Sequence, residues 1–409
     1  MFDWGNSAFT TLVVTFIYAT YFTKSIVPDP VRGPVLWSRA ITITGLCVAV
    51  LSPFLGSLAD RRGSRRQYLW YSTLICVLMT AGLTVIRPTL AHAGYLALGC
   101  FTVANIAFEI QMVFYNAYLP ELAPPARAGR ISGYGWGMGY VGGLLCMAVA
   151  LFVFVRPNPW LTLSSLEGFN VRATNLLAAG WMLVFGLPFL LRAPKPAPTL
   201  KEKRMGARDR IQQSLATLKQ RPDIARFLLA RLLYNDGLVT IFAFGGIYAA
   251  TVFHMTTTEI LVFGIALNLA AGAGALAFGF IDDSIGPKPT IAISLLALSM
   301  ATVLAASADS RGMLWLAGIA IGLFAGPNQS ASRSYMSRMA PLERHTEFFG
   351  LFALSGKLTA FAGPLVLGLV TGWSGSMRSG IAVIVVFFVV GGWLLLSRSL
   401  DRTWDAGHE

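Results

Sequence analysis

The sequence predicts an all-α membrane protein with twelve transmembrane helices, arranged as two six-helix bundles related by a pseudo-two-fold axis. Three observations support this prediction. The chain is 55% hydrophobic and only 12% charged, its apolar runs reach the roughly 20 residues that cross a bilayer, and one short polar loop occurs twice. Soluble domains carry about twice this fraction of charged residues. The 409 residues are therefore expected to lie mainly within a membrane.

The apolar runs predict twelve spans. We place them at residues 6–27, 36–58, 66–86, 93–118, 131–155, 172–192, 227–253, 257–281, 288–307, 312–337, 347–371 and 378–398. The first span follows neither a basic segment nor a cleavage site, so we expect a retained helix and not a signal peptide. The composition predicts an N-terminal bundle in 1–191, a basic cytoplasmic linker in 192–226 and a C-terminal bundle in 227–409. Prolines and basic residues are typical of such a linker.

A polar loop at residues 56–66 joins the second and third spans and recurs 223 residues later. The repeat pairs Gly56 with Gly279, Asp60 with Asp283, Gly63 with Gly286 and Arg65 with Lys288. We expect Gly56 and Gly63 to permit a close backbone approach and a positive φ. Two copies of one loop, each between apolar runs, indicate a transporter built from repeats.

A second repeat supports the duplication. Residues 118–133 match residues 335–350 at an offset of 217, and residues 17–19 match 247–249. The first of these matches pairs Tyr118, Ala123, Pro124, Arg127 and Gly133 with Tyr335, Ala340, Pro341, Arg344 and Gly350. The two six-span halves are therefore predicted to share one structure.

The net charge of +13 is distributed unevenly, and this distribution predicts the orientation of the chain in the membrane. It does not indicate nucleic-acid binding. Most Lys and Arg residues lie on the side of the 56–66 loop, which includes Arg61 and Arg65. The positive-inside rule places that face in the cytoplasm, and both termini with it. The surplus charge favours contact with anionic lipids.

The sequence gives no sign of catalysis or of a cofactor. The four cysteines lie in separate apolar runs, without C-x-x-C spacing, so we interpret them as small apolar residues and not as metal ligands. The histidines show no catalytic or metal-binding spacing, and no phosphate-binding loop is present. We therefore expect neither an enzyme nor a metal site.

A few polar side chains lie within the predicted spans, where a charge costs on the order of 2.5–3.5 kcal/mol. They fall on helical stripes of the first, fourth, seventh and tenth spans, which share a face at i, i+4 and i+7. We expect them to line a solvated pathway. The candidates for substrate binding or coupling are Tyr18, Asn105, Glu109, Asn116, Asn235, Asp236, Asn328, Gln329, Arg333 and Lys357.

Asp236 and Lys357 are level in depth, which predicts an ion pair between them, with Arg333 as a competitor for Asp236. A mobile pair would bind a zwitterion or exchange a proton, whereas a fixed pair would hold the C-terminal bundle together. Glu109 has no evident partner in its own half, which suits proton coupling. The alternative is a carboxyl group bonded to Asn105 or to a neighbouring helix.

The loop and several further stretches resemble the major facilitator superfamily, and within it the bacterial "unknown major facilitator" family, relatives of the fungal vacuolar amino-acid effluxers. These stretches are residues 3–9, 114–120, 132–136, 234–237, 332–334, 347–351 and 356–357. Gly5 departs from the usual Ala of the first motif. The resemblance implies that helices one, four, seven and ten line a central cavity and that three, six, nine and twelve face lipid.

The resemblance also implies a gate. It places Asp60 near the start of helix eleven, close to Glu347 and Phe348, where a contact would close the cytoplasmic side. Gly56, Gly63, Asp283 and Gly286 would belong to the same machinery, together with Arg61 and Arg65. The alternative is that Asp60 merely caps its own hairpin.

The expected function is secondary active transport of a small, amino-acid-like solute by alternating access, coupled to protons. The expected setting is a bacterial inner membrane, with a monomer that binds its substrate and the lipid bilayer. The alternatives are an exporter of drugs or lipids, and a membrane scaffold or receptor that does not transport.

Overall fold

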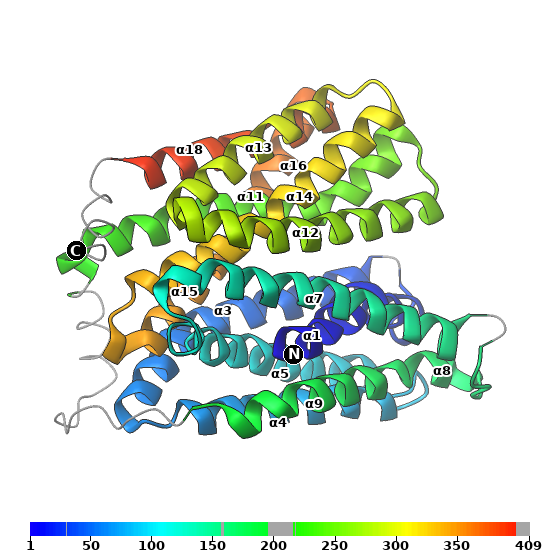
Figure 1. The fold of residues 1–409 in the computed structure, drawn as a ribbon. Coiled ribbons are helices and arrows are strands. Elements are labelled where there is room, and N and C mark those ends of the chain that lie inside the picture. Colours follow the sequence, from blue (N-terminus) through cyan, green and yellow to red (C-terminus); the bar gives the residue numbers. More distant parts are fainter. Residues whose placement is uncertain (30, 157–158, 195–215, 217, 398–409) are drawn as a thin grey trace. The chain divides into compact units, whose positions relative to one another are not determined.

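The computed structural model describes the chain except for residues 30, 157–158, 195–215, 217 and 398–409 (Figure 1). Most of the predicted linker at 192–226 therefore lies outside the described residues. The described part of the chain is helical and contains no strand. Ten of its helical segments are long and apolar enough to cross a membrane.

The chain forms two compact units that do not follow the sequence halves. Unit 1 contains Met1–Leu51, Arg62–Tyr115 and Met138–Pro198. Unit 2 contains Ser52–Arg61, Asn116–Gly137 and Thr199–Glu409, so two short segments of the first half belong to it. The predicted division at residues 192–226 stays a prediction.

The helices of the first half follow the six predicted spans within a few residues. They are α1 (Phe2–Ala8), η1 (Phe9–Phe16), α2 (Tyr18–Tyr21), η2 (Phe22–Ile26), α3 (Arg32–Arg62), α4 (Arg65–Gly82), η3 (Leu83–Val85), α5 (Ala93–Asn116), α6 (Leu119–Leu122), η4 (Pro125–Arg127), α7 (Ala128–Ala150), η5 (Leu151–Val155), η6 (Leu166–Gly168), α8 (Phe169–Arg172) and α9 (Thr174–Arg192).

The second half repeats the pattern. Its helices are α11 (Pro222–Phe253), α12 (Thr257–Ile285), α13 (Pro287–Ser307), α14 (Arg311–Met339), η7 (Leu342–Arg344), α15 (His345–Lys357), α16 (Ala362–Ser374), α17 (Met377–Ala382) and α18 (Ile384–Leu396).

Two predicted spans are absent from the ten, each for a physical reason. The first span is divided into α1, η1, α2 and η2, of which η1 and η2 are π-helical. Such wide turns inside helices occur often at functional sites. The tenth span is α14, whose interior contains the polar run from Asn328 to Arg333. Together with the ten apolar segments, these two account for the twelve predicted helices.

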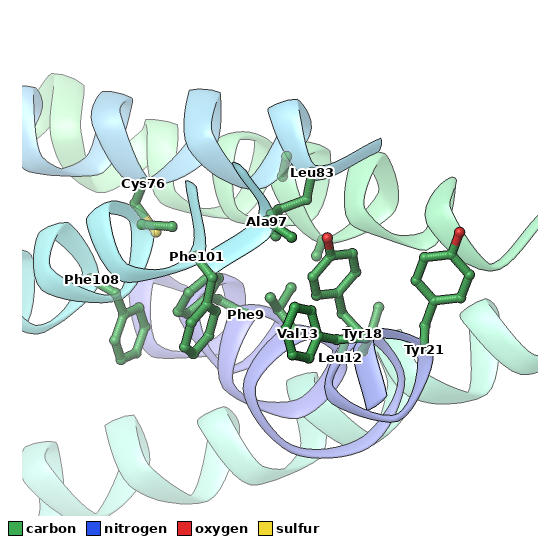
Figure 2. Packing of buried hydrophobic residues seen from close by; sticks show 14 of the residues in the cluster. Phe9, Leu12, Val13, Tyr18, Tyr21, Cys76, Leu83, Ala97, Phe101 and Phe108 are labelled. Atoms are coloured by element: carbon green, nitrogen blue, oxygen red, sulfur yellow. The ribbon is translucent and has the colours of Figure 1, made fainter. Parts of the chain in front are cut away.

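Unit 1 has an aromatic core around the divided first helix (Figure 2). The Phe9 ring stacks on Phe108 at 5.1 Å, and Trp37 stacks on Phe101 at 4.0 Å. Tyr18, predicted to face a solvated pathway, lies in this core with 0% exposure. Its hydroxyl has no hydrogen-bond partner among the described residues, so Tyr18 packs as an apolar side chain.

Within unit 2, the predicted eleventh span is not one helix. α15 ends at Lys357 and α16 begins at Ala362. The sequence explains the break, because Pro364 lacks the N–H that a continuous helix needs and its ring clashes with the carbonyl four residues earlier. A new start at Ala362 places Pro364 in the first turn of α16, where no intrahelical N–H bond is required.

Candidate functional site

Asp60, near the end of α3, is bound to the first turn of α15. Its Oδ1 accepts the Thr346 N–H at 3.2 Å and its Oδ2 accepts the Glu347 N–H at 2.9 Å. The first N–H groups of a helix have no intrahelical partner and carry a partial positive charge, which favours a carboxylate. Asp60 is 8% exposed. We call Asp60, Thr346 and Glu347 the first carboxylate latch. The predicted position of Asp60, near Glu347, is confirmed.

The glycines of the first loop meet the expectations made for them. A Cβ on Gly56 would lie 2.4 Å from the Thr346 carbonyl oxygen, so only glycine allows α3 to approach α15 this closely. Gly63 has a φ of 57° and Gly286, its equivalent in the repeat, has a φ of 92°. Both angles lie in the region that glycine adopts without a steric penalty.

Asp283, near the end of α12, makes the same kind of contact with the start of α7. Its Oδ1 accepts the Gly129 N–H at 2.8 Å, and its Oδ2 accepts the Arg130 N–H at 3.4 Å. The Arg130 Nε donates to the same Oδ2 at 2.6 Å. Asp283, Gly129 and Arg130 form the second carboxylate latch.

The two latches occupy equivalent positions of the repeat. α7 begins at Ala128 and α15 at His345, so each carboxylate binds the second and third residues of a helix. The offset of 217 residues maps Gly129 and Arg130 onto Thr346 and Glu347. The close crossings also repeat. A Cβ on Gly279 would lie 2.9 Å from the Arg130 Cα, as one on Gly56 would meet Thr346. Gly129 and Arg130 were not predicted as site residues, although this offset identifies them.

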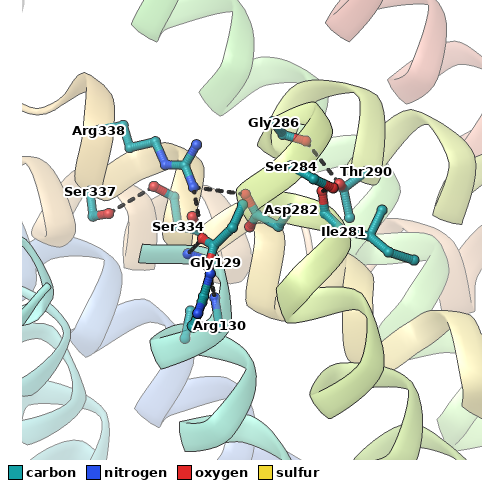
Figure 3. Close-up of polar contacts among 12 residues, drawn as sticks. Gly129, Arg130, Ile281, Asp282, Ser284, Gly286, Thr290, Ser334, Ser337 and Arg338 are labelled. Carbon is teal, nitrogen blue, oxygen red and sulfur yellow. Dashed lines mark hydrogen bonds and ion pairs between the residues drawn. The ribbon is translucent and has the colours of Figure 1, made fainter. Parts of the chain in front are cut away.

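The side chains around the latches differ. At the second latch, Arg338 pairs with Asp282 at 3.0 Å and with Asp283 at 3.5 Å, while Arg130 pairs with Asp283 (Figure 3). Asp282 is 1% exposed. At the first latch, the residue equivalent to Arg130 is Glu347, whose Oε2 accepts the Arg344 Nε at 2.9 Å. An arginine therefore supports the second latch directly, and at the first latch a second carboxylate stands in the equivalent position.

Arg333 ties α14 to the segment at 116–137 inside unit 2. Its Nη2 donates to the Ser132 carbonyl oxygen at 2.6 Å and its Nε to the Ser132 Oγ at 2.9 Å. Its Nη1 donates to the Asn116 Oδ1 at 3.2 Å. The side chain is 4% exposed, and its guanidinium lies 5.9 Å from the centre of the Trp136 ring. The prediction that Arg333 competes for Asp236 is therefore wrong.

Asp236 also differs from its prediction. Its Oδ2 accepts the Gly363 N–H at 3.0 Å, and its Oδ1 is buried with no hydrogen-bond partner in the part of the chain that the structure describes. The structure thus bonds Asp236 to the first turn of α16 and does not form the predicted ion pair with Lys357. The prediction assumed a continuous eleventh helix, in which the Gly363 N–H would already be bonded to a carbonyl oxygen.

The predicted polar stripe of α14 packs inside unit 2. The Asn328 Nδ2 donates to the Ser294 Oγ of α13 at 3.0 Å, and the Ser332 and Tyr234 hydroxyl groups lie 2.8 Å apart. Asn328 and Ser332 are buried. These contacts join α14 to α13 and α11 and stabilise the bundle interior.

The other predicted site residues lie at several positions. Asn105 is buried and Glu109 half-buried on α5, Gln329 is half-buried on α14, Lys357 is half-buried at the end of α15, Arg61 is half-buried on α3, and Arg65 is buried at the start of α4. Their proposed roles stay predictions.

Comparison with known proteins agrees with this architecture. The fucose:proton symporter FucP of E. coli superposes with a TM-score of 0.72 at 13% identity, over 96% of this chain and 97% of that chain. The uncharacterized MFS-type transporter YxiO of Bacillus subtilis (strain 168) is 23% identical over 396 residues, which cover 96% of this chain and 91% of YxiO. The chain is therefore a multi-pass membrane transporter of the major facilitator type, and not an enzyme.

The family follows from a more specific match. The model of the family described as "Vacuole effluxer Atg22 like" matches residues 34–406, and the chain belongs to this family. Among the fungal relatives, autophagy-related protein 22-1 of Neosartorya fischeri is 23% identical over 301 residues, which cover 67% of this chain and 48% of the relative. The chain thus spans about half the length of that relative.

Proposed function

We propose that this protein moves a small, amino-acid-like solute across a bacterial inner membrane by alternating access, coupled to protons. The observation that carries the proposal is the duplicated carboxylate latch. One buried carboxylate in each half of the sequence binds the free N–H groups of a helix in the other half. Charge-assisted hydrogen bonds of this kind are strong enough to stabilise one conformation of the transporter. Because each latch contains only a few of them, they can be broken during the transport cycle.

The latches give alternating access a physical basis. Each consists of two or three hydrogen bonds to a carboxylate, and such bonds contribute about 1.5–3 kcal/mol each. A free-energy difference of this size is comparable to the few kcal/mol that separate two populated conformations. By the positive-inside rule, the basic residues around the loop at 56–66 support a cytoplasmic location for both latches and for both termini. Releasing the latches would open that side.

The substrate class is drawn from the family. Its description names a vacuole effluxer, and efflux of small solutes fits the sequence resemblance to vacuolar amino-acid exporters. Proton coupling is supported by the half-buried Glu109 on α5, a carboxyl group within a predicted span. FucP, a fucose:proton symporter, shares the fold. We expect the protein to act as a monomer within the bilayer.

Counterflow in proteoliposomes tests the proposal. Purified protein is first screened by thermal shift against amino acids, sugars, nucleosides and lipids, and each stabilising compound is then loaded into vesicles. We expect labelled amino acid to exchange without a gradient and to accumulate when a pH gradient is imposed. Glu109→Gln should keep exchange and lose accumulation, because exchange requires no net proton movement.

The controls separate the possible results. Asp309→Asn, an exposed carboxylate between α13 and α14, should behave as wild type. Accumulation that persists in Glu109→Gln contradicts its role in coupling. Counterflow of a lipid or drug, without counterflow of amino acids, would support the alternative that the protein exports drugs or lipids. Absence of counterflow for every stabilising compound contradicts transport.

A further inference from the structure

The break between α15 and α16 is a departure from the repeat. The equivalent helix of the first half, α7, runs without interruption from Ala128 to Ala150. At the offset of 217 residues, the break at 358–361 falls on residues 141–144, inside α7. The position equivalent to Pro364 is Met147, so the first half lacks the residue that ends a helix here. The fold itself therefore does not require the break.

Side chains of α11 bind both ends of the break. The Arg231 Nη1 donates to the Phe352 carbonyl oxygen at 2.7 Å, and the Asn235 Nδ2 donates to the Gly356 carbonyl oxygen at 3.2 Å. On the other side, the Asp236 Oδ2 accepts the Gly363 N–H at 3.0 Å. Asn235 thus meets the negative end of α15, Arg231 binds the turn before it, and a carboxylate meets the positive end of α16. In transporters, discontinuous helices with polar ends of this kind bind substrates and coupling ions.

Only one of the two carboxylate oxygens of Asp236 accepts a hydrogen bond from a described residue. Asp236 is 2% exposed, and no described residue of the chain provides a hydrogen-bond partner for its Oδ1. A Cβ on Gly363 would lie 2.1 Å from the Thr240 Oγ1 and 3.2 Å from the Asp236 Oδ1, so both oxygens lie against the same glycine, and the Thr240 Oγ1 donates to the Asp236 carbonyl oxygen at 2.7 Å. A buried carboxylate oxygen without a partner is costly, and a small cation at that oxygen would remove the cost.

The charged residues on α11 and on the elements packed against it do not neutralise this oxygen by a direct contact. Those residues are Asp223, Arg226 and Arg231 on α11, Glu259, Asp282 and Asp283 on α12, Arg311, Arg333 and Arg338 on α14, His345, Glu347 and Lys357 on α15, and Arg378 on α17. α16 and α18 carry no charged side chain.

The first half again provides the comparison. The match of residues 17–19 with 247–249 pairs Asn6 with Asp236. The Asn6 Oδ1 accepts the Gln111 Nε2 at 3.1 Å, and its Nδ2 donates to the Met112 sulfur at 3.4 Å. A neutral, fully bonded amide therefore stands where the second half has a carboxylate with a free oxygen. The carboxylate and the helix break occur together, and only in the second half.

We propose that Asp236, Thr240 and the start of α16 form a binding site for a small monovalent cation, either a proton or sodium, at the Asp236 Oδ1. Occupation of the site weakens the bond from the Gly363 N–H, because a neutralised carboxyl group is a poorer acceptor than a carboxylate. The first turn of α16 is then held less tightly. The proposal of a cation site does not depend on the proposed function. The role of this site in coupling does, because it requires the transport proposed above.

Hydrogen–deuterium exchange of the intact protein in lipid nanodiscs tests the site without measuring transport. Peptides covering residues 358–365 are compared between wild type and Asp236→Asn at each pH, so that the intrinsic effect of pH on exchange cancels. At alkaline pH without sodium, we expect wild type to exchange about tenfold more slowly than the variant, since a charged acceptor is the stronger one by ~1.4 kcal/mol. Acidification removes this difference if the cation is a proton, and added sodium at alkaline pH removes it if the cation is sodium.

The outcomes distinguish this proposal from the proposed function. Equal exchange in wild type and Asp236→Asn at every pH and sodium concentration overturns the site, as does a difference that neither cation removes. If the variant does not fold, the site is tested by the effect of sodium on wild type at constant pH and by the effect of pH on wild-type protection factors, and Asp309→Asn serves as the matched control. Cation-dependent exchange in a protein without counterflow would support the site and contradict transport.

Discussion

At the scale of single residues, the second and third N–H groups of two helices decide where the carboxylates lie. The partner of Asp60 was predictable because a family resemblance indicated it. The partner of Asp283 was equally encoded, since the repeat places Gly129 and Arg130 opposite it, but it was not predicted. The partner of Asp236 was predicted wrongly, because depth in the membrane says nothing about which backbone groups are free. That depends on Pro364, which ends one helix before another begins.

Gly56 provides the sharpest residue-scale test. A Cβ there would lie 2.4 Å from the Thr346 carbonyl oxygen, whereas a Cβ on Gly45 of the same helix meets nothing within 4 Å. Gly56→Ala should therefore destabilise the protein by about 1–3 kcal/mol through overpacking, and Gly45→Ala should stabilise it by about 0.5–1 kcal/mol through helix propensity. Thermal unfolding in detergent compares the two. Equal effects would show that α3 does not pack against α15 as described.

At the scale of helices, apolar runs predicted every span to within a few residues, because a membrane-length run specifies its own extent. The interruptions were harder to predict. The π-helical turns η1 and η2 contain neither glycine nor proline, so neither of these helix-breaking residues distinguished them. The break before Ala362 had a signal in Pro364, which a count of apolar residues overlooks. Hydropathy predicts where a helix lies, whereas its interruptions depend on proline and on tertiary contacts.

The junction of α12 and α14 allows an element-scale prediction. Arg338 pairs with the buried Asp282 at 3.0 Å, so Arg338→Met leaves an unpaired carboxylate and should cost about 3–5 kcal/mol of unfolding free energy. Adding Asp282→Asn removes the stranded charge and should recover a large part of that loss. Unfolding by denaturant in mixed micelles gives the double-mutant cycle. Additive losses would mean that the pair does not interact in the membrane protein.

At the scale of the whole molecule, composition and the duplicated loop were enough to predict the class of protein. The compact units were not predictable, because the sequence halves end near residue 192 while unit 2 also includes Ser52–Arg61 and Asn116–Gly137. These two segments are the ones that bear Asp60 and bind Asp283. Packing between residues that are far apart in the sequence determines this grouping, and no local sequence pattern reports such packing.

The orientation in the membrane is a prediction at the same scale. In a background without the native cysteines, Arg62→Cys and Ala91→Cys place single thiols at two exposed positions, one at the end of α3 before α4 and one between α4 and α5. A membrane-impermeant maleimide should label Ala91→Cys in intact cells and Arg62→Cys only after permeabilisation, because the arginine-rich loop is retained in the cytoplasm. The reverse labelling would invert the topology and move both latches to the outer face.

The carboxylate latches bind main-chain N–H groups, which every residue except proline provides. Glu347 could therefore stand where the other copy has Arg130 without loss of either bond, and the second loop could have fewer basic residues than the first while Asp283 kept its place. In a duplicated gate of this kind, the side chains next to one latch can change while its hydrogen bonds to the main chain are kept. The two halves can diverge in charge while their closing surfaces remain interchangeable in shape.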